Sequence, residues 1–180
     1  MVKNVLPSRR QVLSGGLLLS VAWAIPSPPG LAGEQSGVEP DMGQVVVDWR
    51  TGLALYGMDP VAYFAERRAV PGLPEFEIEL SRVPWRFSNS GNRAAFLAAP
   101  AAYMPRFAGY DPVAVGRAVA APGNPLLWLT FEQRLYLFQR QENRTAFAAD
   151  PRPVIAAGLE HWPALRQKLD ATGATAGGTF

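Results

Sequence analysis

Residues 75–100 read EFEIELSRVPWRFSNSGNRAAFLAAP, and this stretch decides how the chain folds. Residues 75–80 alternate acidic and apolar side chains, which is the period of a half-buried β-strand with its acids on one face. Residues 84–88 predict a second strand that pairs back through Ser81 and Arg82. The first half of the stretch is therefore expected to be an antiparallel hairpin.

A short helix is predicted directly after this hairpin. Asn89 or Ser90 supplies an N-cap, and Pro100 ends the helix at about residue 99, because proline cannot continue it. The inner face of the helix is expected to carry Ala95, Phe96 and Ala99.

A similar pattern occurs later in the chain, where residues 126–131 and 135–138 predict a second hairpin around Glu132 and Gln133. The other expected elements are strands over residues 44–49 and 53–56, a helix over residues 60–66 that starts at Asp59-Pro60, and helices over residues 143–149 and 154–170. Short β-hairpins interleaved with short helices indicate the α+β class, and we expect a small single domain over residues 44–170.

The first 33 residues have the pattern of an export signal. Lys3, Arg9 and Arg10 precede an uncharged, apolar run over residues 12–25, and no acidic residue occurs before Glu34. A membrane-spanning helix needs about 20 apolar residues, so this run is short for a span.

The pair Arg9-Arg10, followed by two apolar residues, resembles the twin-arginine signal, which exports proteins already folded. We therefore expect residues 1–33 to direct the chain to the periplasm, with cleavage after Ala24 or Ala32. A general secretory signal and an uncleaved membrane anchor are the alternatives. The export machinery is one expected partner.

The basic charge of the chain belongs to this signal. The whole sequence has 17 Lys and Arg against 15 Asp and Glu, and loss of three cations leaves 14 against 15. The remaining basic residues are scattered, apart from the pair Arg67-Arg68, so nucleic-acid binding is not supported. Residues 34–43 are expected to be a flexible leader and residues 171–180 a disordered tail, with no membrane span in the mature chain.

The chain has no cysteine and one histidine, His161. This composition excludes disulfides, cysteine-ligated zinc, iron–sulfur clusters and a thiol nucleophile. His161 has no second histidine beside it, and we expect it to be a surface or capping residue at the start of a helix. No nucleophile–base pair, phosphate-binding loop or pair of catalytic acids is found, so the sequence does not predict an enzyme.

Four motifs in order are similar to those of the YHS domain family, and in particular of its exported subgroup. They are Trp85-x-Phe87 followed by Gly91, Phe96 and Pro100-x-x-Tyr103; the upstream segment YGMDPVAYF at 56–64; Ala108-Gly109-Tyr110; and HWPAL at 161–165. The resemblance covers roughly residues 45–168. It implies a YHS-like α+β fold and a metal- or small-ligand-binding accessory role.

The chain departs from the family at the positions where relatives carry cysteine or selenocysteine. Those positions hold Ala62, Ser88, Asn92 and Asp111. A thiolate site for copper or zinc needs deprotonated sulfur, which this chain does not supply. If a site persists, it is degenerate and cysteine-free.

A ligand site is nonetheless expected where the family signature lies, formed by Asp59, Tyr63, Phe64, Trp85, Tyr110 and Asp111. Aromatic walls with one or two aspartates suit a small ligand or a hard cation, and no metal is assigned. The alternative is a packed aromatic core in which both aspartates cap helices. Glu75, Glu77 and Glu79 are interpreted as a solvated strand face rather than a cation site.

The segment Gly-x-Asp-Pro-Val-Ala occurs twice, at residues 57–62 and 109–114. So short an identity does not by itself establish a duplication, but it indicates that Asp111 is a helix N-cap. From the sequence we expect an exported, non-catalytic, metal- or small-ligand-binding accessory protein. The alternative is a structural or protein-interaction module in the periplasm with no ligand and with a protein partner.

Overall fold

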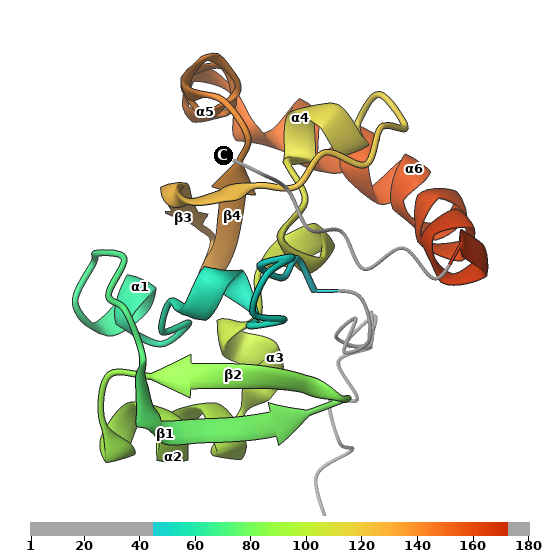
Figure 1. The fold of residues 1–180 in the computed structure, drawn as a ribbon. Helices are drawn as coiled ribbons and strands as arrows, with labels where there is room; N and C mark the ends of the chain where they lie inside the picture. The colour runs from blue at the N-terminus through green and yellow to red at the C-terminus, as the bar shows by residue number, and fades with distance from the viewer. Residues whose placement is uncertain (1–44, 173–180) are drawn as a thin grey trace, which may run out of the picture. The chain divides into compact units, whose positions relative to one another are not determined.

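The computed structural model describes residues 45–172 (Figure 1). The predicted export signal, including Arg9 and Arg10, and the predicted leader over residues 34–43 lie outside the described residues, as do residues 173–180. The described chain is mixed, with short helices and two small antiparallel sheets, which agrees with the predicted α+β class. Within it, no helix is long and apolar enough to cross a membrane.

Two consecutive units of the same design make up residues 45–172, and we call them the first and the second repeat. The first repeat contains η1 (Leu55–Gly57), α1 (Ala62–Ala65), β1 (Leu73–Leu80), β2 (Val83–Phe87), α2 (Ser90–Ala98) and α3 (Pro100–Tyr103). The second contains η2 (Arg106–Gly109), α4 (Pro112–Val115), β3 (Asn124–Phe131), β4 (Arg134–Phe138), α5 (Gln141–Ala149) and α6 (Pro151–Thr172). The element order of the two repeats is identical, with α6 in place of the short α3.

The two hairpins have the same register and the same irregularities. Strand β1 pairs antiparallel with β2, and β3 with β4, and each pair has one register shift near the start of its first strand. Each hairpin turn holds two residues with positive φ: Ser81 and Arg82 in one, Glu132 and Gln133 in the other. These are the backbone angles of a type I′ turn, which matches the twist of the paired strands.

Backbone details repeat as well. Gly72 donates a hydrogen bond to the carbonyl of Gly57 at 2.8 Å, and Gly123 donates to that of Gly109 at 3.0 Å. A Cβ at Gly72 would lie 2.4 Å from the carbonyl carbon of Arg86, and one at Gly123 would lie 2.5 Å from the Cβ of Leu137. Only glycine fits such close approaches of chain to chain, so both hairpins depend on glycine at the same place.

Each repeat has its own aromatic core. In the first repeat Phe96 of α2 packs on Trp85 and Phe87 of β2, with ring centroids 5.0 and 5.2 Å apart. In the second, Phe147 of α5 packs in the same way on Tyr136 and Phe138 of β4, at 4.7 and 5.2 Å. In Figure 1, α2 lies against the first hairpin and α5 against the second. Each hairpin is therefore closed by the first helix that follows it.

The segment over residues 45–47 joins the two cores. Val45 and Val47 belong to the first cluster of buried residues, whereas Val46, between them, belongs to the second. The N–H of Val46 donates to the carbonyl of Ala108 at 2.8 Å, and the carbonyl of Val46 accepts from Leu55 at 3.0 Å. Alternating side chains of one extended segment thus fill both repeats.

Both predicted hairpins, with their turns, are confirmed. The predicted strands over residues 44–49 and 53–56 are wrong within the described part: Val47 and Ala54 form one isolated bridge, and η1 follows. The two segments are joined by the bonds from Leu55 to Val46 and from Asp48 to Leu53, but the pairing ends where η1 begins, with positive φ at Leu55 and Tyr56. Helix α1 is also shorter than the helix expected over residues 60–66.

The C-terminal helix is longer than expected. It begins at Pro151 and includes residues 171 and 172, which were expected to belong to the disordered tail. Proline at the first helical position starts the helix early, because its missing N–H has no partner there in any case. On α2, Phe96 is buried and Ala95 half-buried as predicted, but Ala99 is exposed, since the helix ends before it.

The hairpin turns offer a test of this fold. The left-handed region costs most residues about 1 kcal/mol or more, whereas Asn and Gly adopt it readily. The double variant Ser81→Asn, Arg82→Gly is therefore expected to raise the free energy of unfolding by about 1 kcal/mol. Glu132→Asn with Gln133→Gly is expected to do the same. Urea denaturation measures both. The control Arg93→Gly, inside α2, should lower the free energy of unfolding by about 1 kcal/mol. If neither turn variant is more stable than the wild type, the type I′ geometry is contradicted.

Candidate functional site

Asp59 lies at the centre of the first repeat and is completely buried. Its Oδ1 accepts from the N–H of Val61 at 2.8 Å and of Ala62 at 3.3 Å, at the start of α1. Its Oδ2 accepts from the N–H of Ser88 at 2.8 Å, the hydroxyl of Ser88 at 2.7 Å and Nδ2 of Asn92 at 2.7 Å. One carboxylate therefore joins the loop before α1 to the turn between β2 and α2.

Asp111 has the same position in the second repeat and is equally buried. Its Oδ1 accepts from Val113 at 2.9 Å and Ala114 at 3.4 Å, and its Oδ2 accepts from the N–H of Gln139 at 2.7 Å and Nδ2 of Asn143 at 2.8 Å. Asp111 is the N-cap of α4, as the recurring motif indicated. Both carboxylates have donors on both oxygens, so the geometry assigns them to internal bridging.

The aromatic residues of the predicted site lie in the core. Tyr63 is buried, donates its hydroxyl proton to the carbonyl of Pro125 at 2.9 Å, and packs edge-on against Trp128, with ring centroids 5.1 Å apart. Phe64 is half-buried against Tyr103. Through Tyr63 the first repeat is bonded to the start of β3 in the second.

The six predicted residues fall into two groups. Tyr63 and Trp85 belong to the first core cluster, with Phe64 packed against it, whereas Tyr110 belongs to the second and packs on Trp162 at 5.8 Å. Asp59 and Asp111 each serve their own repeat. The structure places these side chains in two aromatic cores.

Burial raises the pKa of the Tyr63 phenol above its ordinary value of 10.0, and the nearby Asp59 carboxylate raises it further. Both causes favour the neutral phenol. Tyr63 therefore stays a hydrogen-bond donor over the physiological pH range.

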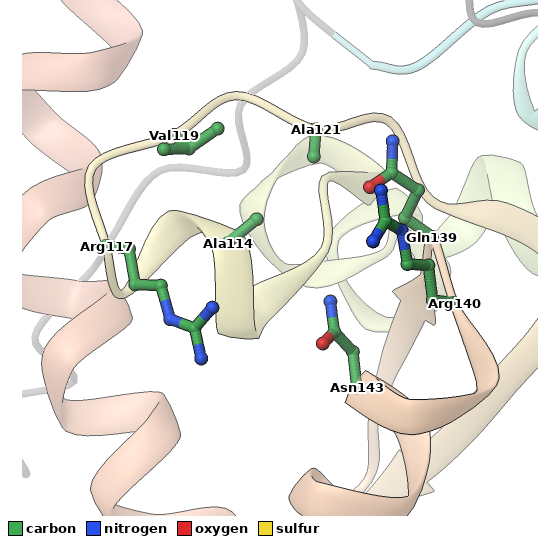
Figure 2. A pocket seen from close by; sticks show the side chains of 7 residues that line it. All are labelled: Ala114, Arg117, Val119, Ala121, Gln139, Arg140 and Asn143. Atoms are coloured by element: carbon green, nitrogen blue, oxygen red, sulfur yellow. The ribbon is translucent and has the colours of Figure 1, made fainter.

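A cleft in the second repeat has a volume of about 180 Å³ and is formed by residues that the sequence did not single out (Figure 2). It is lined by Ala114, Arg117, Val119, Ala121, Gln139, Arg140 and Asn143. Figure 2 shows Arg117 on one side of the hollow and Gln139 and Arg140 on the other. This cleft combines an apolar wall with polar groups that converge from two loops.

A signal for this cleft exists in the sequence. Asp111 lies 52 residues after Asp59, and Asn143 lies 51 residues after Asn92. Alignment of the two halves therefore matches the aspartate–asparagine contact of one repeat with that of the other. The recurring motif Gly-x-Asp-Pro-Val-Ala indicates this equivalence but is too short to establish a duplication by itself. The arginines carry no local motif of their own.

The other candidates take no part in a site. His161 lies within α6, not at the start of a helix as expected, and its Nδ1 is 2.9 Å from the carbonyl oxygen of Ala157. The acids of β1 are exposed, as predicted, and Glu77 pairs with Nε of Arg86 at 2.7 Å. Within residues 45–172 no three acidic or histidine side chains are grouped so as to hold a metal ion.

No family model, no curated protein and no solved structure matches this chain. The resemblance to the YHS domain family therefore depends on its short sequence motifs.

Replacement of either bridging aspartate is expected to destabilise the protein strongly. Asp59→Ala and Asp111→Ala each leave several buried donors without an acceptor, so each should lower the free energy of unfolding by about 3 kcal/mol or more. Urea denaturation measures the loss. The control Asp48→Ala removes an exposed turn carboxylate with similar local bonds and should cost much less. Equal losses in all three variants would contradict the bridging role.

Stability at alkaline pH tests the environment of Tyr63. Above about pH 10 the unfolded chain loses the phenolic proton while the folded protein keeps it, so the free energy of unfolding falls as pH rises. Tyr63→Phe should be about 1 kcal/mol less stable at pH 7, because the Pro125 carbonyl loses its donor, yet should lose less stability between pH 9 and 11. If the free energy of unfolding of Tyr63→Phe falls with pH as steeply as that of the wild type, this assignment is contradicted.

Proposed function

We propose that this chain is an exported, non-catalytic accessory protein of YHS-like type that binds a small organic ligand in the periplasm. The sequence motifs and the pattern of residues 1–33 support the family and the location. The observation that carries the binding role is the cleft of about 180 Å³ beside Asp111, where polar side chains of two loops converge around an apolar wall. Ligand sites combine these two features.

A metal role at the two aspartates is disfavoured by their hydrogen bonds. Hard cations need carboxylate oxygens with free lone pairs and several oxygen ligands together. Here Asp59 and Asp111 accept bonds on both oxygens from groups of their own repeat. A cation would have to displace these bonds, and the fold depends on them. We therefore place the ligand in the cleft.

The alternative, a module that acts by binding another protein, is favoured by one observation. Within residues 45–172, Trp49 and Leu126 are the most exposed large apolar side chains, at 61% and 63%, and a protein partner would cover such surface. Affinity capture from the periplasm with wild type and with a Trp49→Ser, Leu126→Ser double variant tests it. A specific partner lost in the variant would favour the interaction role.

The ligand-binding role is tested on protein recovered from the periplasm after native export. Native mass spectrometry is expected to show an added small-molecule mass that disappears on denaturation, and elemental analysis is expected to show copper, zinc, iron and nickel below stoichiometric amounts. Stoichiometric metal would overturn the choice of a small organic ligand. A protein mass with no addition, together with a specific captured partner, would replace this proposal by the interaction role.

A further inference from the structure

The two guanidinium groups of the cleft, on Arg117 and Arg140, carry charge that the described chain does not compensate. Neither makes a hydrogen bond or an ion pair within residues 45–172, and both side chains are exposed at the rim. The neighbouring polar side chains, Gln139 and Asn143, are half-buried. Arginine is the residue best suited to planar oxyanions, because its N–H groups can bond two oxygens at once.

The first repeat serves as an internal comparison. There the loop after the short helix carries Glu66, which pairs with Arg68 at 2.5 Å, and beside them Arg67, whose side chain makes no hydrogen bond or ion pair within residues 45–172. In the first repeat the segment from the bridging aspartate to the next residue with positive φ runs from Asp59 to Arg67. Its counterpart in the second repeat runs from Asp111 to Ala118 and is one residue shorter. The second repeat has no acid over residues 112–121. The second repeat therefore differs in that the loop carrying Arg117 has no acidic side chain beside the arginine.

A second difference lies at the start of the following helix. In the first repeat the side chain of Asn89 caps α2 by accepting the N–H of Asn92 at 2.8 Å. In the second repeat Arg140 is the N-cap of α5, and it makes no side-chain capping bond. At this position the second repeat has a cation where the first has a neutral acceptor, and Glu142 is the acidic residue in the first turn of α5.

Hydrogen bonds fix the backbone of the two segments that carry these groups. The N–H groups of Arg117 and Val119 both donate to the carbonyl of Ala114, at 2.9 and 3.0 Å, so the loop is tied to α4. On the other side, Asp111 fixes Gln139 through its N–H and Asn143 through its side-chain amide. The walls of the cleft are therefore positioned before any ligand binds, which lowers the entropic cost of binding.

The acid closest in sequence to the cleft is Glu142, which adjoins Asn143 in the first turn of α5. The acid bonded to residues of the cleft lining is Asp111. Both of its oxygens accept hydrogen bonds from its own repeat, and it is fully buried. Its charge is therefore partly offset by the donors around it, whereas the two guanidinium groups at the rim face solvent.

We propose that this cleft binds a small molecule through a carboxylate or phosphate group, held by Arg117 and Arg140. The inference rests on the proposed ligand-binding function and names its chemical class. A volume of about 180 Å³ admits one such group with a short hydrocarbon part, which the apolar wall of Ala114, Val119 and Ala121 would contact.

Calorimetric titration of the full exported protein tests the proposal, with inorganic phosphate, acetate and succinate as separate probes at constant ionic strength. At least one probe is expected to bind saturably, and to bind more weakly as salt is raised. The double variant Arg117→Gln, Arg140→Gln should bind at least ten-fold more weakly. The control Arg93→Gln makes the same type of charge change in α2 and should stay within two-fold of wild type.

Comparison of the probes distinguishes phosphate from carboxylate as the preferred group. No saturable binding of any probe, or equal loss in Arg93→Gln, would overturn the anion proposal. Both arginines are exposed, so the variants are expected to fold, and circular dichroism checks this. If a small molecule found on the native protein by mass spectrometry is kept by the double variant, the anion proposal fails while the ligand-binding function stands. If neither ligand nor probe binds, both fail.

Discussion

The described fold depends on one interaction that is made twice: a buried aspartate whose two oxygens bond to two different loops. In each repeat Oδ1 caps the short helix after the Asp-Pro step, and Oδ2 holds the turn from the second strand into the next helix. Because backbone N–H groups buried without an acceptor are costly, a single carboxylate makes both loops stable in one arrangement. In each repeat the bridge joins the loop before the short helix to the turn that leads from the hairpin into the helix covering it.

The two repeats share the bridging aspartate but differ in the residues around it. The bridge from Asp111 to Asn143 preserves the scaffold of the second repeat. The residues around it are then free to differ, and the acid and capping amide of the first repeat are absent there, with Arg140 in the place of Asn89. The cleft we propose as a ligand site lies at these differences. The scaffold and the binding groups thus come from different residues of the same two loops.

Much of the first repeat was predictable, because its signals are local. The alternation over residues 75–80 and the cap at Asn89 correctly predicted a hairpin and a helix. The strands expected around Val47 and Ala54 failed, since β-branched residues favour extended backbone without saying which segment they pair with. That segment bonds to Leu55, within the expected partner segment, but also to Ala108, which no local pattern indicates. The predicted site combined aromatic residues from both cores because their sequence motifs do not indicate which core each side chain enters.

The sequence by itself determined the α+β class, both hairpins, the absence of thiol chemistry and the capping role of Asp111. Only the tertiary structure decided that the two halves are equivalent, since their identity lies in hydrogen-bond geometry and backbone angles more than in side chains. It also decided that Arg117 and Arg140 share one cleft. These arginines are 23 positions apart in the sequence, and no sequence pattern indicates that two separated charged residues lie in one cleft. Their proximity arises because Asp111 draws the two loops that carry them together.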